Sequence, residues 1–558
     1  MTPTQKILII GGVAGGASAA TRLRRLSESA EIIIFERGEF ISFANCGLPY
    51  YIGGEITEKS ALILQSPLSF KARYNIDVRI QHEIISIDRS SKTVLVKNYQ
   101  TGEIYSENYD KLILSPGAKP ICPDEFQSDR IFTIRNIPDT YRIKLFLDTK
   151  KPQHAVVAGG GFIGLEMTEN LQRAGVNVTI VECGNHVLST FDYDVACNVD
   201  SYIESKGVQL FLNHEIKSII EQDGRIIVTF NQGGKIITDM IIFAVGVRPD
   251  TSFVQNAGIA ANSHGAIIVT ETMQTSDPDI YAIGDAVSAV NFVTENSDYI
   301  PLAGPAGKQG RIAADQICNI DSQYSGSQGS AILRIFDMTI ASTGISEFNA
   351  KNSGLNYEKI FLWSSNHADY YPRAANMLIK VVFERETGKL LGTQIVGYDG
   401  VDKRCDVIAT AIRAKMTACD LAKLDLCYAP PYSSVKDPVN MAGFVIDNVI
   451  TGKMKIFHWH DVKELQESDN TVLLDVRTLA EYNRGHIEGF INIPVDELRN
   501  RIDELDKSKK IYVTCQVGIR GYIAVRILMQ NGFDAYNLSG GYRLWSSIFV
   551  TKIQSYKR

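Results

Sequence analysis

Two stretches of the chain each combine a short apolar strand, a cluster of glycines and a helical pattern, and this repeat constrains the fold more than any other feature. The first is KILIIGGVAGGASAATRLRRL, and the second is HAVVAGGGFIGLEMTENLQRAG. Each is followed by another strand pattern, the first ending at Glu36 and the second at Glu182. Alternating strands and helices are typical of parallel sheets covered by helices. The sequence therefore predicts an α/β protein with two Rossmann-like nucleotide-binding domains.

The second stretch has the glycine spacing of a dinucleotide-binding loop. Gly159, Gly161 and Gly164 fit the pattern G-x-G-x-x-G between a strand and a helix. Such glycines allow a tight turn and a close backbone approach, while the helix N-terminus holds a pyrophosphate. Glu182 lies 18 residues past the last glycine. A carboxylate at this position accepts hydrogen bonds from the ribose hydroxyls and repels a 2′-phosphate. The pattern predicts NADH in preference to NADPH.

The first stretch is less regular, because Val13 stands where the middle glycine usually lies. Its glycines are Gly11, Gly12, Gly15 and Gly16. Glu36 nevertheless repeats the ribose-acceptor position. Asp285, in IYAIGDAV, follows another strand, where it either binds a second region of a cofactor or caps a helix. Two nucleotide folds in one chain suggest that one holds a tightly bound flavin and the other binds the hydride donor.

Composition excludes several other classes of protein. The net charge of −6 argues against a nucleic-acid binder, and no apolar run approaches the roughly 20 residues of a membrane-spanning helix. The N-terminus lacks the apolar region of a signal peptide, and nine cysteines in 558 residues are too sparse and odd in number for a disulfide framework. We expect a cytoplasmic protein with reduced thiols and no metal site.

Cys46 is the cysteine whose surroundings predict chemistry. It lies ten residues after Glu36, in SFANCGLPYYIGG, and hence close to the first nucleotide site. A Gly-Leu-Pro turn or helix start follows it. A thiol near a helix N-terminus and a flavin can have a lowered pKa and react as the thiolate, although a cysteine chosen at random is more often buried and inert.

These motifs identify a family resemblance. The first 450 residues resemble the pyridine-nucleotide disulfide oxidoreductases, and SFANCGLPYYIGG together with YAPPYSSVKDPVN resembles the coenzyme A disulfide reductases among them. The resemblance implies FAD, NADH, a homodimer and a small thiol, disulfide or persulfide substrate. It implies a flavin site that includes Gly11, Gly12, Ala14, Gly15, Glu36, Arg37, Ser115, Gly117 and Asp285. It implies an NADH site that includes Gly159, Gly161, Phe162, Ile163, Gly164, Glu182 and Gly246.

The sequence departs from the glutathione-reductase branch of that family. The position of a second cysteine, five residues after Cys46, is Tyr51, and no histidine occurs between His367 and His458. Cys46 must therefore store its oxidised state as a mixed disulfide with coenzyme A or as a persulfide. The resemblance places Tyr370 and Tyr428 beside its sulfur, with Tyr428 coming from the dimer partner; the alternative for both tyrosines is interface packing.

Coenzyme A carries phosphates, so its site needs cations. Arg22 and Arg25 lie three apart on the first helix, where they either bind phosphate or form a solvated face. The substrate contacts implied by the resemblance are Ser18, Arg22, Arg25, Ser42, Asn45, Lys71, Arg73 and Lys436. Whether coenzyme A is a substrate or stays bound is left open.

The C-terminal part of the chain resembles a rhodanese domain. LLDVRTLAEYNRGHIEGFINIP matches the signature D-x-R-x-x-x-E-[YF]-x-x-G-H-I, and CQVGIR matches the active-site loop C-x-x-G-x-R. Backbone N–H groups that curl round Cys515 and end at Arg520 would stabilise a thiolate and then a persulfide. We predict that Cys515 handles sulfane sulfur, unless the domain is purely structural.

The predicted domains are an FAD domain (1–118 and 245–325), an NAD domain (119–244), an α+β dimerisation domain (326–452) and an α/β rhodanese domain (456–558). TGKMKIFHW, between the last two, is predicted to be a linker. The predicted function is the NADH-dependent reduction of coenzyme A disulfide, coenzyme A persulfide or polysulfide through Cys46.

Two other functions stay open. An NADH oxidase or peroxidase would cycle Cys46 through a sulfenic acid, although Ala14 stands where such peroxidases carry a histidine. A non-catalytic flavoprotein would serve as a redox sensor or a sulfur-carrier scaffold.

Overall fold

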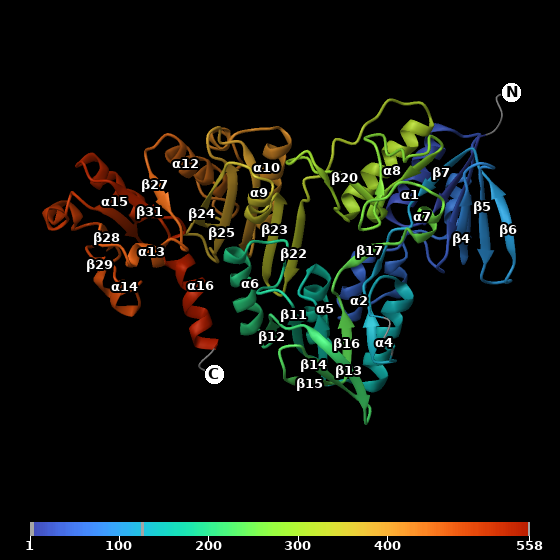
Figure 1. Ribbon diagram of the computed structural model, residues 1–558, viewed down its shortest axis with the longest axis horizontal. Helices are drawn as coiled ribbons and strands as arrows, with labels where there is room; N and C mark the ends of the chain where they lie inside the picture. Colours follow the sequence, from blue (N-terminus) through green and yellow to red (C-terminus); the bar gives the residue numbers. More distant parts are fainter. Residues whose placement is uncertain (1–4, 124–125, 127, 556–558) are drawn as a thin grey trace. The chain divides into compact units, whose positions relative to one another are not determined.

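The computed structural model describes residues 5–123, 126 and 128–555. Contacts divide the chain into two compact units (Figure 1). Unit 1 comprises Met1–Asn185 and Val208–Gly329, and unit 2 comprises His186–Gly207 and Ser330–Arg558. The chain thus leaves unit 1, contributes one helix to unit 2 and returns before it enters unit 2 for good.

The first sheet of unit 1 has five parallel strands in the order β19-β7-β1-β2-β3. Their bounds are β1 Lys6–Ile10, β2 Glu31–Glu36, β3 Asp77–Ile80, β7 Lys111–Leu114 and β19 Ile280–Ala282. The strands read as continuous apolar runs because both faces of the sheet are buried. Helix α1 (Ala14–Leu26) packs against α8 (Ala303–Ile317) over this sheet. The first glycine cluster therefore lies at the carboxyl end of β1, where parallel sheets bind ligands.

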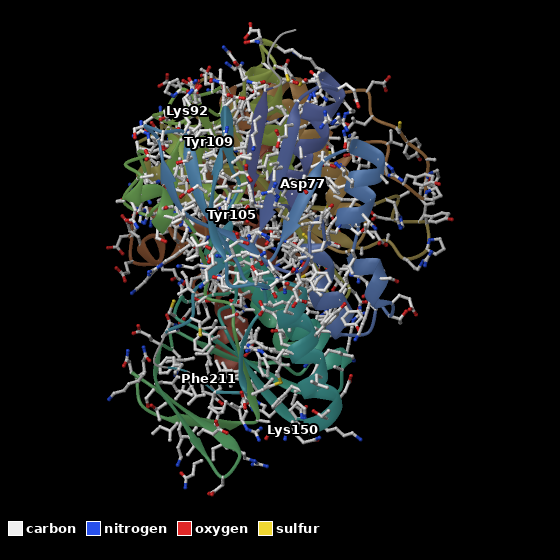
Figure 2. All side chains as sticks on the ribbon, turned by 90° about the vertical axis from the view of Figure 1, so that its right-hand side faces the viewer. Asp77, Lys92, Tyr105, Tyr109, Lys150 and Phe211 are labelled. Carbon is white, nitrogen blue, oxygen red and sulfur yellow. The ribbon has the colours of Figure 1, made fainter. Side chains whose placement is uncertain are left out.

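A three-stranded antiparallel sheet flanks this region: β4 (His82–Asp88), β5 (Thr93–Asn98) and β6 (Ile104–Asn108). Figure 2 shows the labelled side chains of Asp77 and Tyr105 on this part of unit 1. The Arg79 guanidinium joins them, because it donates to Asp77 Oδ2 at 2.9 Å and to Tyr105 Oη at 3.1 Å. This contact ties β6 to β3 of the parallel sheet.

The second parallel sheet of unit 1 has the order β12-β11-β10-β16-β9. Its strands are β9 Ile131–Thr133, β10 His154–Ala158, β11 Asn177–Glu182, β12 Gln209–Leu212 and β16 Met240–Phe243. Helix α5 (Phe162–Arg173) follows the second glycine loop. A three-stranded antiparallel sheet packs on it: β13 (Ile216–Gln222), β14 (Arg225–Phe230) and β15 (Lys235–Thr238). Phe211, labelled in Figure 2, stacks on Phe230 of β14.

Shorter elements complete unit 1. Its remaining helices are α2 Leu48–Ile52, α3 Pro67–Tyr74, α4 Ile137–Lys150 and α7 Ser252–Asn256, and its short 3₁₀ turns are η1 Asn45–Gly47, η2 Lys59–Leu62 and η3 Gly284–Ala286. Its remaining strands are β8 Ala118–Pro120, β17 Val247–Pro249, β18 Ile267–Ile268, β20 Val287–Val290 and β21 Ser297–Asp298.

Unit 2 contains a five-stranded antiparallel sheet in the order β22-β23-β26-β25-β24. The strands are β22 Ala331–Ile335, β23 Met338–Gly344, β24 Tyr357–Ser365, β25 Asn376–Glu384 and β26 Leu390–Gly397. Its helices are α9 Glu347–Asn352, α10 Val401–Arg413, α11 Ala418–Leu421 and α12 Pro438–Ile450. Helix α6 (Tyr193–Ser205), the segment that leaves unit 1, also packs on this sheet.

The C-terminal part of unit 2 is a parallel sheet in the order β27-β31-β30-β28-β29. The strands are β27 Lys455–Phe457, β28 Thr471–Asp475, β29 Ile491–Asn492, β30 Lys510–Thr514 and β31 Ala535–Leu538. The helices are α13 Val462–Gln466, α14 Leu479–Arg484, α15 Ile519–Gln530 and α16 Gly541–Ser555, with short 3₁₀ turns η4 Leu498–Asn500 and η5 Ile502–Glu504. These sheets confirm the predicted α/β class.

The stretch predicted as a linker is not one. Part of TGKMKIFHW forms β27, which pairs with β31, so the chain enters the C-terminal sheet directly. This part of the chain also docks on the antiparallel sheet of unit 2. The Phe361 N–H donates to Ser539 Oγ at 2.9 Å, and the Arg543 guanidinium stacks 4.0 Å from the centre of the Trp363 ring. Sequence patterns showed two folds but could not show that they pack together.

A buried charge cluster holds α6 to the same sheet. Lys380 is fully buried and contacts the carboxylates of Asp192, Asp194 and Glu347 at 3.0, 2.8 and 2.7 Å. Trp459 Nε1 donates to Asp194 at 3.3 Å. The cluster therefore joins the antiparallel sheet, α6 and the start of the C-terminal domain.

Candidate active sites

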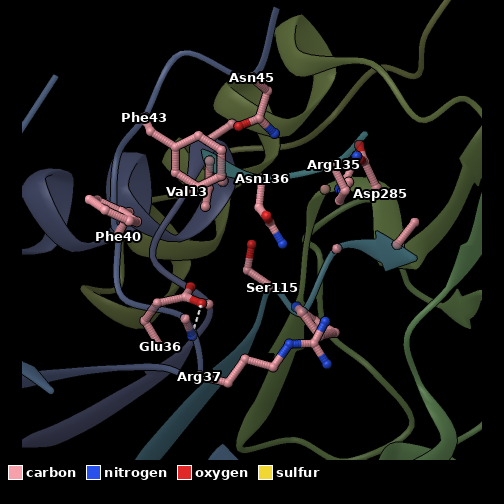
Figure 3. Close-up of a pocket in the computed structure, with 18 of the residues that line it drawn as sticks. Val13, Glu36, Arg37, Phe40, Phe43, Asn45, Ser115, Arg135, Asn136 and Asp285 are labelled. Carbon is pink, nitrogen blue, oxygen red and sulfur yellow. Dashed lines mark hydrogen bonds and ion pairs between the residues drawn. The ribbon is translucent and has the colours of Figure 1, made fainter. Parts of the chain in front are cut away.

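A pocket opens in unit 1 at the carboxyl end of the first parallel sheet, and Figure 3 shows its lining. The lining comes from five stretches that are distant in sequence, within residues 11–15, 36–45, 115–118, 135–138 and 284–285, and from Ala306. Phe40 and Phe43 supply aromatic surface on one side, and Asp285 with Arg135 lies on another (Figure 3). Sequence reasoning missed Phe40, Phe43 and Arg135 because no local motif marks them.

The glycine loop at the pocket leaves no room for side chains. A Cβ on Gly11 would lie 2.1 Å from the Ser115 carbonyl oxygen, and one on Gly16 would lie 1.9 Å from the Gly11 carbonyl oxygen. The same relation holds in the second loop, where a Cβ on Gly164 would lie 2.0 Å from the Gly159 carbonyl oxygen. Gly16 thus occupies the third-glycine position. The spacing from Gly11 to Gly16 equals that from Gly159 to Gly164, and Gly15, predicted to bind the cofactor, lines the pocket.

The two acidic residues after the glycine loops have matching contacts. Glu36 accepts hydrogen bonds from the N–H groups of Gly12 and Gly38, at 3.0 and 2.8 Å. Glu182 accepts from those of Gly160 and Gly184, at 2.7 and 2.8 Å. Each carboxylate therefore holds its own glycine loop in place. It also has further lone pairs that can accept hydrogen bonds from ribose hydroxyls at the end of its strand.

Other predicted nucleotide residues lie around these loops. Asp285 is the middle residue of η3, and its carboxylate pairs with Arg135 at 2.9 Å instead of capping a helix. Arg37 pairs with Asp250 at 2.5 Å at the edge of the pocket. Ala14, Ser115 and Gly117 line the pocket, while Phe162 and Ile163 begin α5 and Gly246 has a left-handed φ of 110° beside the second loop.

The residues at the pocket fit a flavin dinucleotide. The glycine loop leaves space for a pyrophosphate, and the Glu36 carboxylate can accept hydrogen bonds from a ribose. The aromatic and polar side chains of the lining are left for the rest of the flavin. Asn45 Oδ1 is buried at this lining and has no hydrogen-bond partner within the described residues. A bound polar group would satisfy it.

Cys46 lies in the turn η1, directly before α2, and its side chain is exposed. Its neighbour Asn45 lines the pocket, so the thiol is adjacent to the flavin-type site. Tyr51, the position of a second cysteine in related enzymes, is buried at 7% exposure. Within the described residues, the nine cysteines are all free thiols.

The expected lowering of the Cys46 pKa is not produced by the protein itself. Burial raises the pKa of this thiol, and the carboxylates of Glu166 and Asp285 raise it further. Burial also raises the pKa of Glu166, on α5, to about 7, and its carboxylate accepts from the Tyr50 hydroxyl at 3.4 Å. The groups that surround Cys46 within one chain therefore do not lower its pKa. No local motif marks Glu166.

Tyr370 and Tyr428 lie together in unit 2. Their hydroxyl oxygens are 3.2 Å apart, and the side chains are 76% and 46% exposed. The hydrogen bond from Tyr370 raises the pKa of Tyr428. The two hydroxyls thus form a pair within one chain. Tyr371, Tyr432 and Val435 extend the exposed apolar surface beside them.

The basic side chains predicted to bind phosphate differ in exposure and in whether they are already paired. Arg22 is held by Asp315 of α8 at 2.6 Å and is mostly covered, so it is not an open cation. Arg25, Arg73 and Lys436 are exposed, and Lys71 is exposed with a bond to Asn75. Ser18 donates to the Ala14 carbonyl, and the Ser42 N–H donates to the Gly12 carbonyl beside the first glycine loop.

Cys515 lies between β30 and α15, at the carboxyl end of the C-terminal sheet. Its sulfur is buried and accepts from the Gly518 N–H at 3.1 Å. Arg520 is the second residue of α15 and donates two hydrogen bonds to Glu481, both 2.7 Å. Burial raises the pKa of Cys515, while the N–H groups of residues 517, 518 and 521 and the charge of Arg520 oppose this. The expected cradle of N–H groups is present, but a lowered pKa is not.

Comparison with known proteins gives the family of these domains. Residues 5–310 match the pyridine nucleotide-disulphide oxidoreductase model, residues 331–438 its dimerisation domain and residues 458–548 the rhodanese-like domain. A coenzyme A disulfide reductase of Staphylococcus haemolyticus is 37% identical over 79% of this chain and 99% of its own length.

Two solved structures cover nearly the whole chain. The reduced CoADR-RHD of Bacillus anthracis is 48% identical, with a TM-score of 0.96 over 98% of both chains. An NAD-dependent persulfide reductase of A. fulgidus is 36% identical, with a TM-score of 0.90 over 97% of this chain and 100% of its own. No helix in residues 5–123, 126 and 128–555 is both long and apolar enough to cross a membrane.

The glycine loops, the matching carboxylates and the three matched domains lead to one assignment. The chain is an oxidoreductase that belongs to the pyridine nucleotide-disulphide oxidoreductase family and carries a C-terminal rhodanese-like domain.

Proposed function

We propose that this enzyme uses NADH to reduce the S–S bond of coenzyme A disulfide, coenzyme A persulfide or polysulfide, with FAD as its cofactor and Cys46 as its single redox thiol. One observation carries the proposal: an exposed cysteine adjoins the flavin-type pocket, and a buried tyrosine replaces the second cysteine of a dithiol. The substrate class follows the coenzyme A disulfide reductase and persulfide reductase that the chain resembles.

The residues of unit 1 have distinct parts in this proposal. Gly11, Gly16 and Glu36 would hold the flavin, which when bound supplies two-electron transfer between the nicotinamide and sulfur. Gly159 and Gly164 would admit the pyrophosphate of NADH, and Glu182 would select against NADPH. Cys46 would attack the substrate disulfide as a thiolate, keep one sulfur partner as a mixed disulfide or persulfide and release the other as a thiol.

The residues of unit 2 would complete the site in a homodimer. The exposed apolar surface beside Tyr370 and Tyr428 lies in the family's dimerisation domain and needs cover. The partner subunit would then present both hydroxyls as a pair, which can donate to a thiolate. Arg25, Lys71, Arg73 and Lys436 are the open cations for coenzyme A phosphates. Cys515 would carry sulfane sulfur as a persulfide.

Replacing Cys46 by serine tests the proposal. The variant should keep bound flavin and its bleaching by NADH but lose at least 100-fold in turnover of all three sulfur acceptors, because only the outgoing electrons need the thiol. Cys419→Ser, at a half-buried cysteine of α11 outside both nucleotide loops, is the control and should retain turnover with an unchanged acceptor preference.

Oxygen and hydrogen peroxide, run as further acceptors, separate the alternatives. Faster NADH turnover with either than with the sulfur compounds would make the enzyme an oxidase or peroxidase. No turnover with any acceptor would indicate a non-catalytic flavoprotein. Full disulfide reduction by Cys46→Ser would refute the role of this thiol.

A further inference from the structure

Glu166, on α5, is a buried acid that the packing of two helices brings close to Cys46. The turn that holds Cys46 leads directly into α2, and α2 packs against α5. The contact is tight, because a Cβ on Gly53, at the end of α2, would lie 2.2 Å from Asn170 Oδ1 on α5. Across the same contact the Tyr50 hydroxyl donates to Glu166 Oε1 at 3.4 Å. The position of Glu166 relative to the Cys46 turn is therefore fixed by the fold.

Glu166 lacks a cation, unlike the other carboxylates that act on it or on Cys46. Those carboxylates are Asp285, which pairs with Arg135 at 2.9 Å, and Glu169, which pairs with Arg173 at 2.8 Å. Helix α4, which also packs against α2, contacts Tyr51 through the Tyr141 ring. Within the described residues, Glu166 has no ion pair, and no basic side chain is among the groups that shift its pKa.

The Glu166 carboxyl group and the Cys46 thiol therefore titrate together. Burial raises the pKa of Glu166 to about 7, the Tyr50 hydroxyl opposes this and the charge of Glu169 adds to it. Burial also raises the pKa of Cys46, and ionised Glu166 raises it further. Two negative charges at neighbouring buried sites repel, so the Cys46 thiolate forms more readily when Glu166 holds a proton.

Thiol–disulfide exchange at Cys46 needs a group of this kind. The thiol must lose its proton before it attacks, and the thiolate that leaves must gain one. No histidine occurs between His367 and His458, so the histidine acid of the glutathione-reductase branch is absent from this sequence. A carboxyl group that titrates near neutral pH can accept and return a proton within one cycle.

We propose that Glu166 exchanges protons with the reacting sulfurs, accepting the proton of the Cys46 thiol and returning it to the sulfur that leaves. This inference rests on the proposed function of Cys46. The Cys46 thiol gives its proton to the Glu166 carboxylate, and the thiolate attacks one sulfur of R–S–S–R. The Cys46–S–S–R bond forms, the substrate S–S bond breaks, and R–S⁻ leaves with the electron pair. Glu166 then protonates R–S⁻ to R–SH, so atoms and electrons balance in this step without a further oxidant or reductant.

The first test measures the reactivity of the thiol in Glu166→Gln. The full-length, flavin-loaded enzyme is treated with iodoacetamide without NADH, and modification of the Cys46 peptide is followed by mass spectrometry. At pH 7 the variant should react at least about threefold faster than wild type, because the neutral amide removes a like charge beside the thiolate. Glu55→Gln is the control and should react like wild type, because Glu55 is exposed and pairs with Arg173.

The second test measures the exchange step in the same variant. Enzyme reduced with two electrons by dithionite is mixed with coenzyme A disulfide, and the thiol released in a single turnover is measured. NADH is absent, so an effect of the variant on NADH binding does not enter the result. At pH 7 Glu166→Gln should release thiol at least about tenfold more slowly than wild type, because the proton donor is lost. A thiol that alkylates faster but exchanges more slowly is the signature of this role.

The pH dependence of the single turnover gives a third readout. The wild-type rate should rise with pH as the Cys46 proton leaves, and fall again once Glu166 no longer holds the proton that it returns. Glu166→Gln should lose the fall. Tyr50→Phe removes a hydrogen bond that lowers the pKa of Glu166, so the fall should move to higher pH. Tyr50→Phe keeps the carboxyl group and gives a decision should Glu166→Gln lose its flavin.

Four outcomes would overturn the inference. The first two are Cys46 alkylation in Glu166→Gln within 1.5-fold of wild type, and faster alkylation without loss of the single-turnover rate. The third is alkylation and exchange that both slow at unchanged flavin content, which would indicate a structural role. The fourth is a fall in Tyr50→Phe that stays in place or moves to lower pH. None of these touches the role of Cys46 itself, which fails only if Cys46→Ser still reduces disulfides.

Discussion

Replacing Lys380 by methionine should destabilise unit 2 strongly at neutral pH. Methionine preserves most of the volume of the fully buried side chain, so the main change is electrostatic. Asp192 and Asp194 lose the ammonium that they contact at 3.0 and 2.8 Å. Glu347 keeps its ion pair with Lys359 and the hydrogen bond from the Tyr357 hydroxyl. Removing one member of a buried ion pair costs about 3–5 kcal/mol, because the remaining charges stay buried.

The pKa of Glu347 gives the size of this destabilisation independently. Burial alone would raise it, but Lys380 and Lys359 lower it from 4.5 to about 2. At about 1.4 kcal/mol per pKa unit, this shift corresponds to roughly 3 kcal/mol of stability. A carboxyl group with a lowered folded-state pKa contributes stability above its unfolded pKa and loses it as the pH falls toward the folded value. Wild-type unit 2 should therefore weaken between about pH 4.5 and 2.

In the variant the unpaired carboxylates bind protons more readily, so its deficit should be largest near pH 7 and shrink below about pH 4.5. Urea unfolding followed by tryptophan fluorescence measures this, because all three tryptophans lie in unit 2. Lys455→Met is the control: it breaks a surface pair with Asp534 at 2.7 Å and should cost less than about 1 kcal/mol. A Lys380→Met deficit as small as this, or one independent of pH, would refute the reasoning.

Two further predictions concern the nucleotide sites. Gly16→Ala should purify with at most a tenth of the wild-type flavin, because the added Cβ collides with the Gly11 carbonyl oxygen. The control Gly304→Ala, whose Cβ has no atom within 4 Å, should retain the wild-type flavin content. Flavin absorbance per chain measures both, and full flavin occupancy in Gly16→Ala would contradict the role of the glycine loop. Glu182→Gln should reduce the ratio of kcat/KM for NADH to kcat/KM for NADPH roughly tenfold, which corresponds to about 1.4 kcal/mol. Glu215→Gln, at the surface, is the control. An unchanged ratio in Glu182→Gln would show that the carboxylate does not oppose the 2′-phosphate.

Local sequence patterns were sufficient for the features that depend on neighbouring residues. The glycine spacing, the acid at the end of the next strand and the C-x-x-G-x-R loop each specify a strand, a turn and a helix start within one short stretch. They predicted the α/β class and the equivalent positions of Glu36 and Glu182 at the ends of two strands.

Features that depend on distant residues could not be predicted. Arg135 reaches Asp285 across 150 positions, and Lys380 gathers carboxylates from two other segments. The pKa of Cys46 depends on Glu166, whose position on α5 becomes relevant only once α2 packs against it. The docking of the C-terminal domain through Ser539 and Arg543 likewise involves no motif.

Because α6 lies between two segments of unit 1 in the sequence but packs in unit 2, the enzyme is difficult to divide into separate domains. Helix α6 packs against α16 at the C-terminus, Trp459 reaches Tyr193 and Asp194 on it, and Lys380 binds it from the antiparallel sheet. A fragment that ends near residue 329 would expose the apolar and acidic faces of α6, and one that ends near residue 455 would uncover the face against α16. Neither sequence boundary is a clean excision point. Gene fragments cut there should aggregate, and either half will need redesigned surface residues on α6 before it can be studied alone.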